Sequence, residues 1–107
     1  MKSLKFDEGK LPIDKLFHQF PNALQGVIET STYGHNKYLE TDEDWLSFKR
    51  LDNAKERYKG ALMRHLFAYL NPLQVNIDSE SGLHHLKHAA WNCLALLQLI
   101  YEDEQNY

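Results

Sequence analysis

Cysteine is nearly absent from this sequence, which has one, Cys93, among 107 residues. An internal disulfide is therefore excluded, and with it the framework of bridges that is typical of small secreted domains. Because Cys93 lies in an apolar run, we expect a buried, unreactive thiol. The residues after Met1 contain no apolar stretch of the kind that a secretory signal needs. These features predict a protein of the reducing cytoplasm.

A long hydrophobic run is also missing. The longest apolar stretch, residues 89–100, is interrupted by Asn92 and Gln98, and it is too short to cross a bilayer. Nor is there an excess of basic residues, since 12 lysines and arginines face 15 acidic residues, for a net charge of -3. A general nucleic-acid-binding surface is normally basic. We therefore expect neither a membrane nor nucleic acid as the partner.

Extended structure has little support, because alternation of apolar and polar residues is confined to the short segment 73–77. Hydrophobic residues make up 43% of the 107-residue chain, which is enough for the core of one domain. Residues 1–107 are therefore predicted to form a single all-α domain, a compact bundle of four to five helices. The two long C-terminal helices carry its core. Residues 1–12 are polar and are expected to form an extended arm.

Prolines and glycines predict where the N-terminal helices begin and end. A short helix over 13–20 stops at Pro21, which suits the first turn of a second helix. That second helix is expected to run to about Thr32. Gly34 and Asn36 predict a break after it.

Capping residues predict the remaining helices. The acidic segment 41–44 predicts the start of a short helix around Trp45. Two long helices are expected over 53–70 and 83–102, joined by a loop over 73–82. The capping residues expected for these three helices are Thr41, Asn53 and either Ser79 or Ser81.

The helix predicted over 53–70 has two distinct faces. One of them collects the core candidates Tyr58, Leu62, Leu66 and Tyr69. On another, Arg57 and Arg64 lie two turns apart and almost superposed, with small residues between them and His65 at the edge. Two guanidinium groups beside open space suit a phosphate or carboxylate ligand, because each can donate two parallel hydrogen bonds. The alternative is that both arginines pair with structural acids.

The last predicted helix is apolar around most of its circumference, which is typical of a central helix. Its main apolar stripe consists of Leu83, Leu86, Ala90, Cys93, Leu97 and Ile100. His85, His88 and Asn92 share another stripe at i, i+3 and i+7, whereas His84 is expected to face solvent. Polar groups on a buried helix need partners, since an unpaired one costs about 1–3 kcal/mol. Metal ligands, substrate contacts and internal hydrogen bonds all fit these residues.

Acidic residues precede that helix in the segment Asp78-Ser-Glu80-Ser-Gly82. Capping explains the serines, and Gly82 permits an unusual backbone angle. Two carboxylates are more than a cap needs, and they are what Mg²⁺ requires when it carries nucleotide phosphates. With His85 and His88 following directly, we expect a polar functional site here.

Several segments that span nearly the whole chain form a distinctive series. They are Phe6-Asp-x-x-Lys10, Leu11-Pro-Ile-Asp14, Tyr33-Gly-x-x-Lys37-Tyr38, Trp45, Arg57…Ala61-Leu-x-Arg64-His65-Leu and Asp78-x-Glu80-Ser-Gly-Leu-x-His85-Leu-x-His88-Ala-Ala-x-Asn92. This series resembles the N-terminal domain of the phage-encoded dATP/dGTP diphosphohydrolases. The resemblance implies a phage or prophage origin and hydrolysis of purine deoxynucleoside triphosphates to the monophosphate and pyrophosphate. It also suggests kinship with the helical MazG-like enzymes, whose Glu-Glu-x-x-Glu metal helix this sequence does not reproduce.

Roles for the site residues follow from the chemistry of such an enzyme. The residues expected to hold Mg²⁺ or Mn²⁺ are Asp78 and Glu80. Those expected to bind substrate are Lys37, Tyr38, Arg57, Arg64, His85 and Asn92. Those expected to orient or deprotonate water are His65, His88 and Glu80. Tyr38 or Trp45 is expected to stack on the base. Two alternatives stay open: a phage protein that sequesters a nucleotide or a nucleotide-derived immune signal, and a module that binds a host enzyme. A homo-oligomer in the cytoplasm of the infected bacterium is expected in each case.

Overall fold

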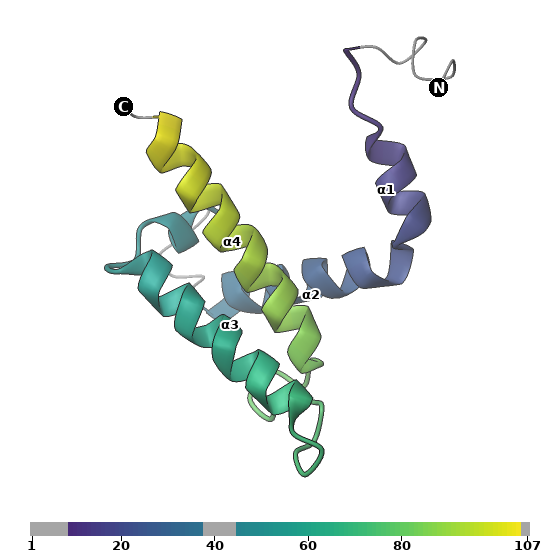
Figure 1. Cartoon of the computed structure of the whole chain (residues 1–107), viewed down its shortest axis with the longest axis vertical. Coiled ribbons are helices and arrows are strands. Elements are labelled where there is room, and N and C mark those ends of the chain that lie inside the picture. The colour runs from purple at the N-terminus through teal and green to yellow at the C-terminus, as the bar shows by residue number, and fades with distance from the viewer. Residues whose placement is uncertain (1–8, 38–44, 106–107) are drawn as a thin grey trace.

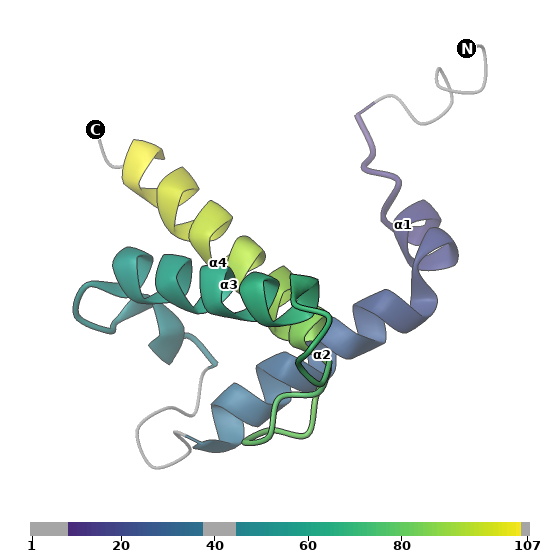
Figure 2. The same ribbon diagram turned by 60° about the horizontal axis from the view of Figure 1, so that its bottom comes forward.

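The computed structural model describes residues 9–37 and 45–105, and its elements are helical (Figures 1 and 2). In chain order they are α1 (Ile13–Gln19), α2 (Pro21–Lys37), the short 3₁₀ helix η3 (Ser47–Lys49), α3 (Ala54–Leu70) and α4 (His85–Gln105). Over these two ranges, extended pairing is limited to one isolated bridge between Ile77 and His84. The predicted all-α fold class is therefore confirmed.

The helices α3 and α4 form the centre of the bundle and pack against each other (Figure 1), as predicted for the two long C-terminal helices. α2 packs across α4, and α1 lies beyond the start of α2, away from the α3–α4 pair in both views. α3 ends before Asn71, whose ψ of 111° is extended, because the proline that follows disfavours helical backbone. None of the helices in the described ranges is long and apolar enough to span a membrane.

The helix α2 is longer than predicted. The sequence predicts a break around Gly34, but α2 continues through it to Lys37. A glycine inside a helix costs only about 1 kcal/mol relative to alanine, and contacts on the last turn offset this cost. His35 stacks on Trp45 with ring centroids 3.7 Å apart, and Lys37 forms an ion pair with Glu80 at 2.7 Å. Tertiary contacts thus override the local helix-breaking signal.

The helix predicted around Trp45 is wrong. Trp45 has a φ of +65°, outside the helical region, and only the three-residue η3 follows it. The stack on His35 holds the indole in place although this backbone angle is unfavourable for an aromatic residue. The expected cap at 41–44, Tyr38 and most of the predicted arm lie outside the described residues. Residues 9–12 are exposed and non-helical ahead of α1.

The connection between α3 and α4 contains a tight turn. The Gly82 N–H donates to the Asp78 carbonyl at 2.8 Å, and the Asp78 N–H donates to the Leu83 carbonyl at 2.8 Å. Gly82 has a φ of +74°, the left-handed conformation that its missing Cβ permits. This turn brings the Asp78 side chain back toward the start of α4.

The start of α4 differs from the prediction. The helix begins at His85, and the Leu86 N–H donates to Nδ1 of His84 at 3.0 Å. The imidazole of His84 therefore takes the capping role predicted for Ser79 or Ser81. Ser81 Oγ accepts a hydrogen bond from the Leu83 N–H at 3.2 Å, within the turn before the helix.

The buried core is made mostly of small side chains. Among the described residues, the buried hydrophobic ones are Tyr58, Ala68, Ala89 and Ala95. The apolar stripe predicted to lie in the core is instead largely exposed: Leu97 keeps 65% and Ile100 45% of their accessible surface, and Cys93 is exposed. On α3, Leu66 and Tyr69 of the predicted core face are also exposed. The reason is that α2 and α3 contact the opposite side of α4, where alanines and polar residues allow close approach.

Candidate functional site

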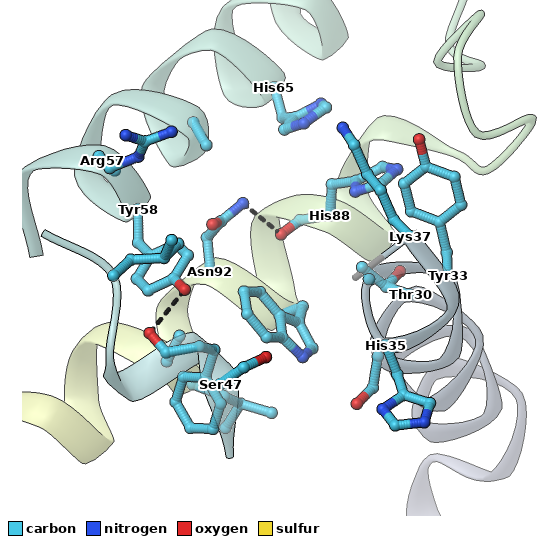
Figure 3. Close-up of a pocket in the computed structure, with 18 of the residues that line it drawn as sticks. Thr30, Tyr33, His35, Lys37, Ser47, Arg57, Tyr58, His65, His88 and Asn92 are labelled. Atoms are coloured by element: carbon cyan, nitrogen blue, oxygen red, sulfur yellow. Dashed lines mark hydrogen bonds between the residues drawn. The ribbon is translucent and has the colours of Figure 1, made fainter. Parts of the chain in front are cut away.

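A cavity of about 910 Å³ opens between α2, η3, α3 and α4 (Figure 3). The predicted site residues that line it are Lys37, Arg57, Arg64, His65, Asp78, Glu80, His88 and Asn92. His85 does not line the cavity but contacts His65 behind it. Tyr38 lies outside the described residues. Residues predicted from three separate segments of the sequence thus surround one cavity.

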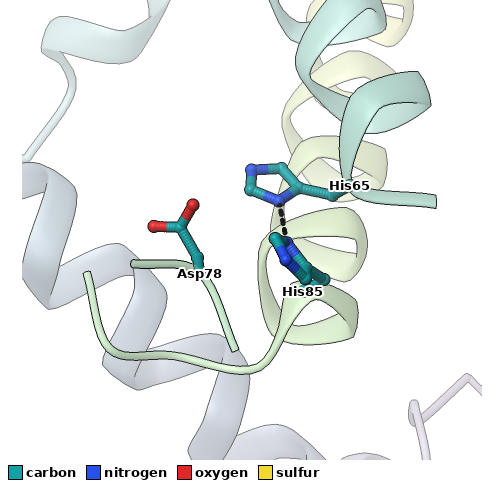
Figure 4. A group of neighbouring side chains, drawn as sticks. All are labelled: His65, Asp78 and His85. Carbon is teal, nitrogen blue, oxygen red and sulfur yellow. Dashed lines mark hydrogen bonds between the residues drawn. The ribbon is translucent and has the colours of Figure 1, made fainter. Parts of the chain in front are cut away.

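Three side chains from three segments form a group beside one end of this cavity: His65 of α3, Asp78 of the connection and His85, the first residue of α4 (Figure 4). One nitrogen from each imidazole and one carboxylate oxygen all lie within 4.8 Å of one another. The Nδ1 atoms of His65 and His85 are 2.8 Å apart. At that distance one of the two nitrogens carries a proton and the other accepts it. These residues are referred to below as the histidine–aspartate group.

Ser81 joins this group to His88. The N–H and the Oγ–H of Ser81 both donate to Oδ2 of Asp78, each at 2.9 Å. His88 Nε2 lies 2.6 Å from the same Oγ. Because the single hydroxyl proton points to Asp78, Nε2 of His88 is the donor in that contact. His88 is therefore not placed to take a proton from Ser81, and Ser81 acts as a support for Asp78.

The protonation states of these groups follow from their surroundings. Burial lowers the pKa of His65, and the neighbouring His88 lowers it further. Burial also lowers the pKa of His88, although Asp78 opposes the shift. For Asp78, burial raises the pKa, but the two hydrogen bonds from Ser81 and the nearby histidines outweigh it and leave the pKa below its ordinary value. At neutral pH the imidazoles of His65 and His88 are therefore neutral and lie beside an ionised carboxylate.

His88 and Asn92 are buried on the side of α4 that faces the cavity. The His88 ring stacks on that of His65, with centroids 4.5 Å apart and planes 8° from parallel. Tyr33 of α2 meets the His88 ring edge-on at 6.0 Å. Asn92 donates from its Nδ2 to the His88 carbonyl at 2.8 Å. The two ring contacts, together with the Ser81 hydroxyl at Nε2, hold the His88 ring in one orientation.

Glu80 is held apart from the histidine–aspartate group. Its carboxylate accepts a hydrogen bond from Lys37 Nζ at 2.7 Å, and bonds from Lys37 and from Tyr33 keep the pKa of Glu80 below its ordinary value. Burial and the bond to Glu80 raise the pKa of Tyr33. Glu80 is thus ionised, with its charge balanced by a lysine across the mouth of the cavity.

Arg57 and Arg64 line the α3 wall of the cavity, and Arg57 is drawn in Figure 3. Within the described part of the chain, neither guanidinium makes an ion pair or a side-chain hydrogen bond, so the structural pairing considered above is not found there. A Cβ at Gly60 would lie 3.1 Å from an Arg64 guanidinium nitrogen. The small residue predicted to leave space beside the arginine does so.

Aromatic rings form the wall opposite the histidines. Trp91 meets Tyr58 and Phe48 edge-on, with centroid distances of 5.4 Å and 5.6 Å. The Tyr58 hydroxyl donates to the Phe48 carbonyl at 2.7 Å. Nearby, the stacked pair of His35 and Trp45 completes the lining. Nδ1 of His35 is buried, and no described residue bonds to it.

The sequence analysis did not single out several residues of the site for a functional role, among them Tyr33, His35, Ser81 and Trp91. Tyr33 and Ser81 stand in the segments that carry the family resemblance, and this was the signal available for them. His35 and Trp91 had no such signal. Their positions depend on contacts with a later or earlier segment, since His35 stacks on Trp45 and Trp91 contacts Phe48 of η3. Asn92, in contrast, was predicted from its stripe on the last helix.

The fold and the cavity define an all-α protein with a polar pocket in which imidazoles, carboxylates and guanidinium groups meet. Residues 1–106 match the family described as dATP/dGTP diphosphohydrolase, N-terminal, and the chain belongs to this family. It is 28% identical over 100 residues to a dATP/dGTP diphosphohydrolase of Salmonella phage PMBT28. The match covers 94% of this chain but spans only 30% of the length of that relative. No solved structure matches this chain.

Proposed function

We propose that this chain forms the nucleotide site of a phage enzyme that hydrolyses purine deoxynucleoside triphosphates to the monophosphate and pyrophosphate with a divalent cation, Mg²⁺ or Mn²⁺. The observation that carries the proposal is the single cavity that Lys37, Arg57 and Arg64 share with His65 and Asp78. Family membership and the name of the phage relative support the substrate class.

Binding of the triphosphate rests on the basic side chains. Arg57 and Arg64 reach the cavity from one wall, where guanidinium groups can each hold two phosphate oxygens. Lys37 adds a third positive charge from the opposite side. Asp78 would hold the divalent cation, which would supply positive charge to the remaining phosphate oxygens. The base is placed against Trp45, whose indole is 48% exposed.

Hydrolysis then requires a water molecule and a proton acceptor. The water oxygen bonds to the α-phosphorus, the bond from that phosphorus to the α–β bridging oxygen breaks, and pyrophosphate leaves with the electron pair. The water proton passes to a side chain. Glu80 is assigned this role because it is ionised at neutral pH and lines the cavity. His88 is a positioning residue, since its Nε2 is engaged with Ser81.

The direct test incubates the purified chain with each deoxynucleoside triphosphate and Mg²⁺ or Mn²⁺, and follows pyrophosphate and monophosphate. Asp78→Asn and Arg64→Ala should each reduce turnover by about 100-fold or more, because charges that act on the transition state contribute on that scale. Lys15→Ala on α1, outside the cavity, is the matched control and should keep the full rate. Full activity in either site variant would show that the site is misplaced.

A second candidate is sequestration of a nucleotide without turnover. It is favoured by the fact that Glu80 and His88 already have partners, Lys37 and Ser81. In that case the chain binds purine deoxynucleotides tightly, Arg64→Ala weakens binding, and no pyrophosphate appears. Calorimetry with the same nucleotides separates the two candidates. Neither binding nor turnover would leave the third alternative, a module that binds a host enzyme.

We also propose that the chain pairs with a second copy through the exposed apolar face of α4, within the cytoplasm of the infected bacterium. Leu97, Ile100 and Tyr101 are all exposed, and a contiguous apolar surface is typical of a protein contact. Sedimentation of the wild type should show a dimer that Leu97→Glu converts to monomer. A wild type that is monomeric at all concentrations would contradict this pairing.

A further inference from the structure

We infer that the histidine–aspartate group, His65, Asp78 and His85, is a binding site for a first-row transition metal ion such as Mn²⁺, Fe²⁺ or Co²⁺, in preference to Mg²⁺. The inference deepens the proposed function, on which the catalytic use of the ion rests. Binding of the ion itself stands on the geometry of the three residues alone.

The geometry fits one ion. The three ligand atoms lie within 4.8 Å of one another, and the two Nδ1 atoms are 2.8 Å apart. Two nitrogens bound at right angles to one ion, each at about 2.1 Å, are about 3 Å apart. The separation of the two Nδ1 atoms therefore already matches that of two ligands on one ion, and binding requires each ring to turn its Nδ1 lone pair from the other nitrogen toward the ion (Figure 4).

The chemistry of the donors selects the class of ion. Two imidazoles and one carboxylate are the ligands that Mn²⁺, Fe²⁺ and their heavier neighbours accept, whereas Mg²⁺ prefers oxygen ligands and keeps several waters. Glu80, the second carboxylate expected from the sequence, is not part of the group and bonds to Lys37 instead. The site thus offers one carboxylate where a magnesium site of the expected kind needs two.

The surrounding contacts support a preformed site. Ser81 directs two hydrogen bonds to Oδ2 of Asp78, and no described residue donates to Oδ1, which leaves that oxygen for a metal. The His88 ring lies flat against His65. Outer contacts of this kind fix the orientation of metal ligands. Because His65 and Asp78 also line the cavity, the remaining positions on the ion face the place where phosphate or water would bind.

The test measures metal binding to the chelator-treated chain without nucleotide. Co²⁺ titration should give one equivalent and visible absorption bands of a nitrogen-ligated ion, and Mn²⁺ should bind in a calorimeter in the presence of a tenfold excess of Mg²⁺. His85→Asn should weaken binding by at least about tenfold, the scale on which even indirect ligand changes act. His84→Asn is the matched control: it removes the adjacent imidazole but keeps an acceptor for the Leu86 N–H, and should bind as the wild type does.

Equal loss in both variants, no loss in either, or displacement of Mn²⁺ by the tenfold excess of Mg²⁺ would overturn the inference. Circular dichroism of both variants checks that the helices are intact. Failure of the inference is distinguishable from failure of the proposed function. If the His85→Asn variant hydrolyses nucleotide with Mg²⁺, the metal assignment is refuted and the proposed function stands. If the wild type binds the metal ion but hydrolyses no nucleotide, the metal assignment stands and the proposed function is refuted.

Discussion

The two opposite faces of α4 differ in a way that hydrophobicity does not suggest. On one face, His88 and Asn92 keep only 9% and 5% of their accessible surface. On the other, Leu97 keeps 65% and Cys93 is exposed. The polar face is thus the one that meets α2 and α3. It also forms part of the candidate site. A helix in a small domain can thus bury the polar residues of a candidate site and leave its apolar residues exposed.

The largest effect expected from this comparison concerns packing on the buried face. Ala89 is 4% exposed, so Ala89→Leu forces extra methyl groups into a closed contact and should lower the free energy of unfolding by about 1–3 kcal/mol. Leu97→Ala on the exposed face should change it by less than about 1 kcal/mol, compared with about 2–5 kcal/mol for a leucine in a core. Urea unfolding of both variants, in dilute protein, provides the comparison.

A reversed ranking would break the comparison. If Leu97→Ala cost more than Ala89→Leu at concentrations where the chain is monomeric, the apolar stripe would be the true core, and the orientation of α4 described here would be wrong. Repeating the unfolding at high protein concentration separates folding from pairing. A cost of Leu97→Ala that appears only there belongs to contact between copies.

A smaller effect tests the aromatic wall that packs beside the polar face. The Tyr58 hydroxyl donates to the Phe48 carbonyl at 2.7 Å, and Tyr58 is 8% exposed. Tyr58→Phe keeps the ring but leaves that carbonyl without this donor, which should lower the free energy of unfolding by about 1 kcal/mol. Thermal unfolding followed by circular dichroism measures the change. An unchanged or higher stability would mean that water replaces the hydroxyl and that η3 is not fixed by this bond.

The exposed face also makes a chemical prediction. Since Cys93 is the single cysteine and is exposed, it should react with a disulfide reagent in the dilute native protein about as fast as after unfolding. At high concentration the reaction should slow, because the proposed second copy covers this face. Release of the coloured thiolate gives both rates. Reaction only in denaturant, at every concentration, would mean that the thiol is buried within the chain as the sequence suggested.

The sequence predicted the helices that end at prolines, and most of the residues that it singled out for a site line one cavity. It could not decide which side of α4 is buried, because leucines and alanines alike favour a buried face, and the deciding contacts come from α2 and α3. It missed the end of α2 for a related reason. The contacts of His35 with Trp45 and of Lys37 with Glu80 join residues that are far apart in sequence, and they outweigh the helix-breaking effect of Gly34.

For the site, helical spacing alone predicted that His85, His88 and Asn92 share one stripe and that the two arginines share another. It did not predict which of the acidic residues lies beside the histidines. Asp78 and Glu80 are two residues apart, yet one lies with the histidines and the other with Lys37. The turn at Gly82 decides this separation, since it directs Asp78 back to Ser81. Such a choice depends on backbone geometry that residue spacing alone does not contain.

The smallest expected effect lies at the far end of the polar face, where Glu102 continues the stripe of His88 and Asn92. Its carboxylate is 2.6 Å from Lys49 Nζ of η3, and bonds from Lys49 and Gln98 hold its pKa below its ordinary value of 4.5. A lowered pKa means that the folded state binds this proton more weakly than the unfolded chain does. The contribution of the pair to stability is therefore present above pH 4.5 and is lost as the pH falls through the folded-state pKa.

Glu102→Gln should accordingly lower the unfolding temperature slightly at pH 7, because exposed ion pairs contribute little, and the difference should shrink as the pH falls below 4.5. Glu104→Gln, at an exposed position of the same helix, is the control and should follow the wild type over the same pH range. A difference between Glu102→Gln and wild type that persists in acid would assign the contact to packing against η3. A difference that vanishes in acid, as expected, shows that charge holds this end of α4 while close packing holds its middle.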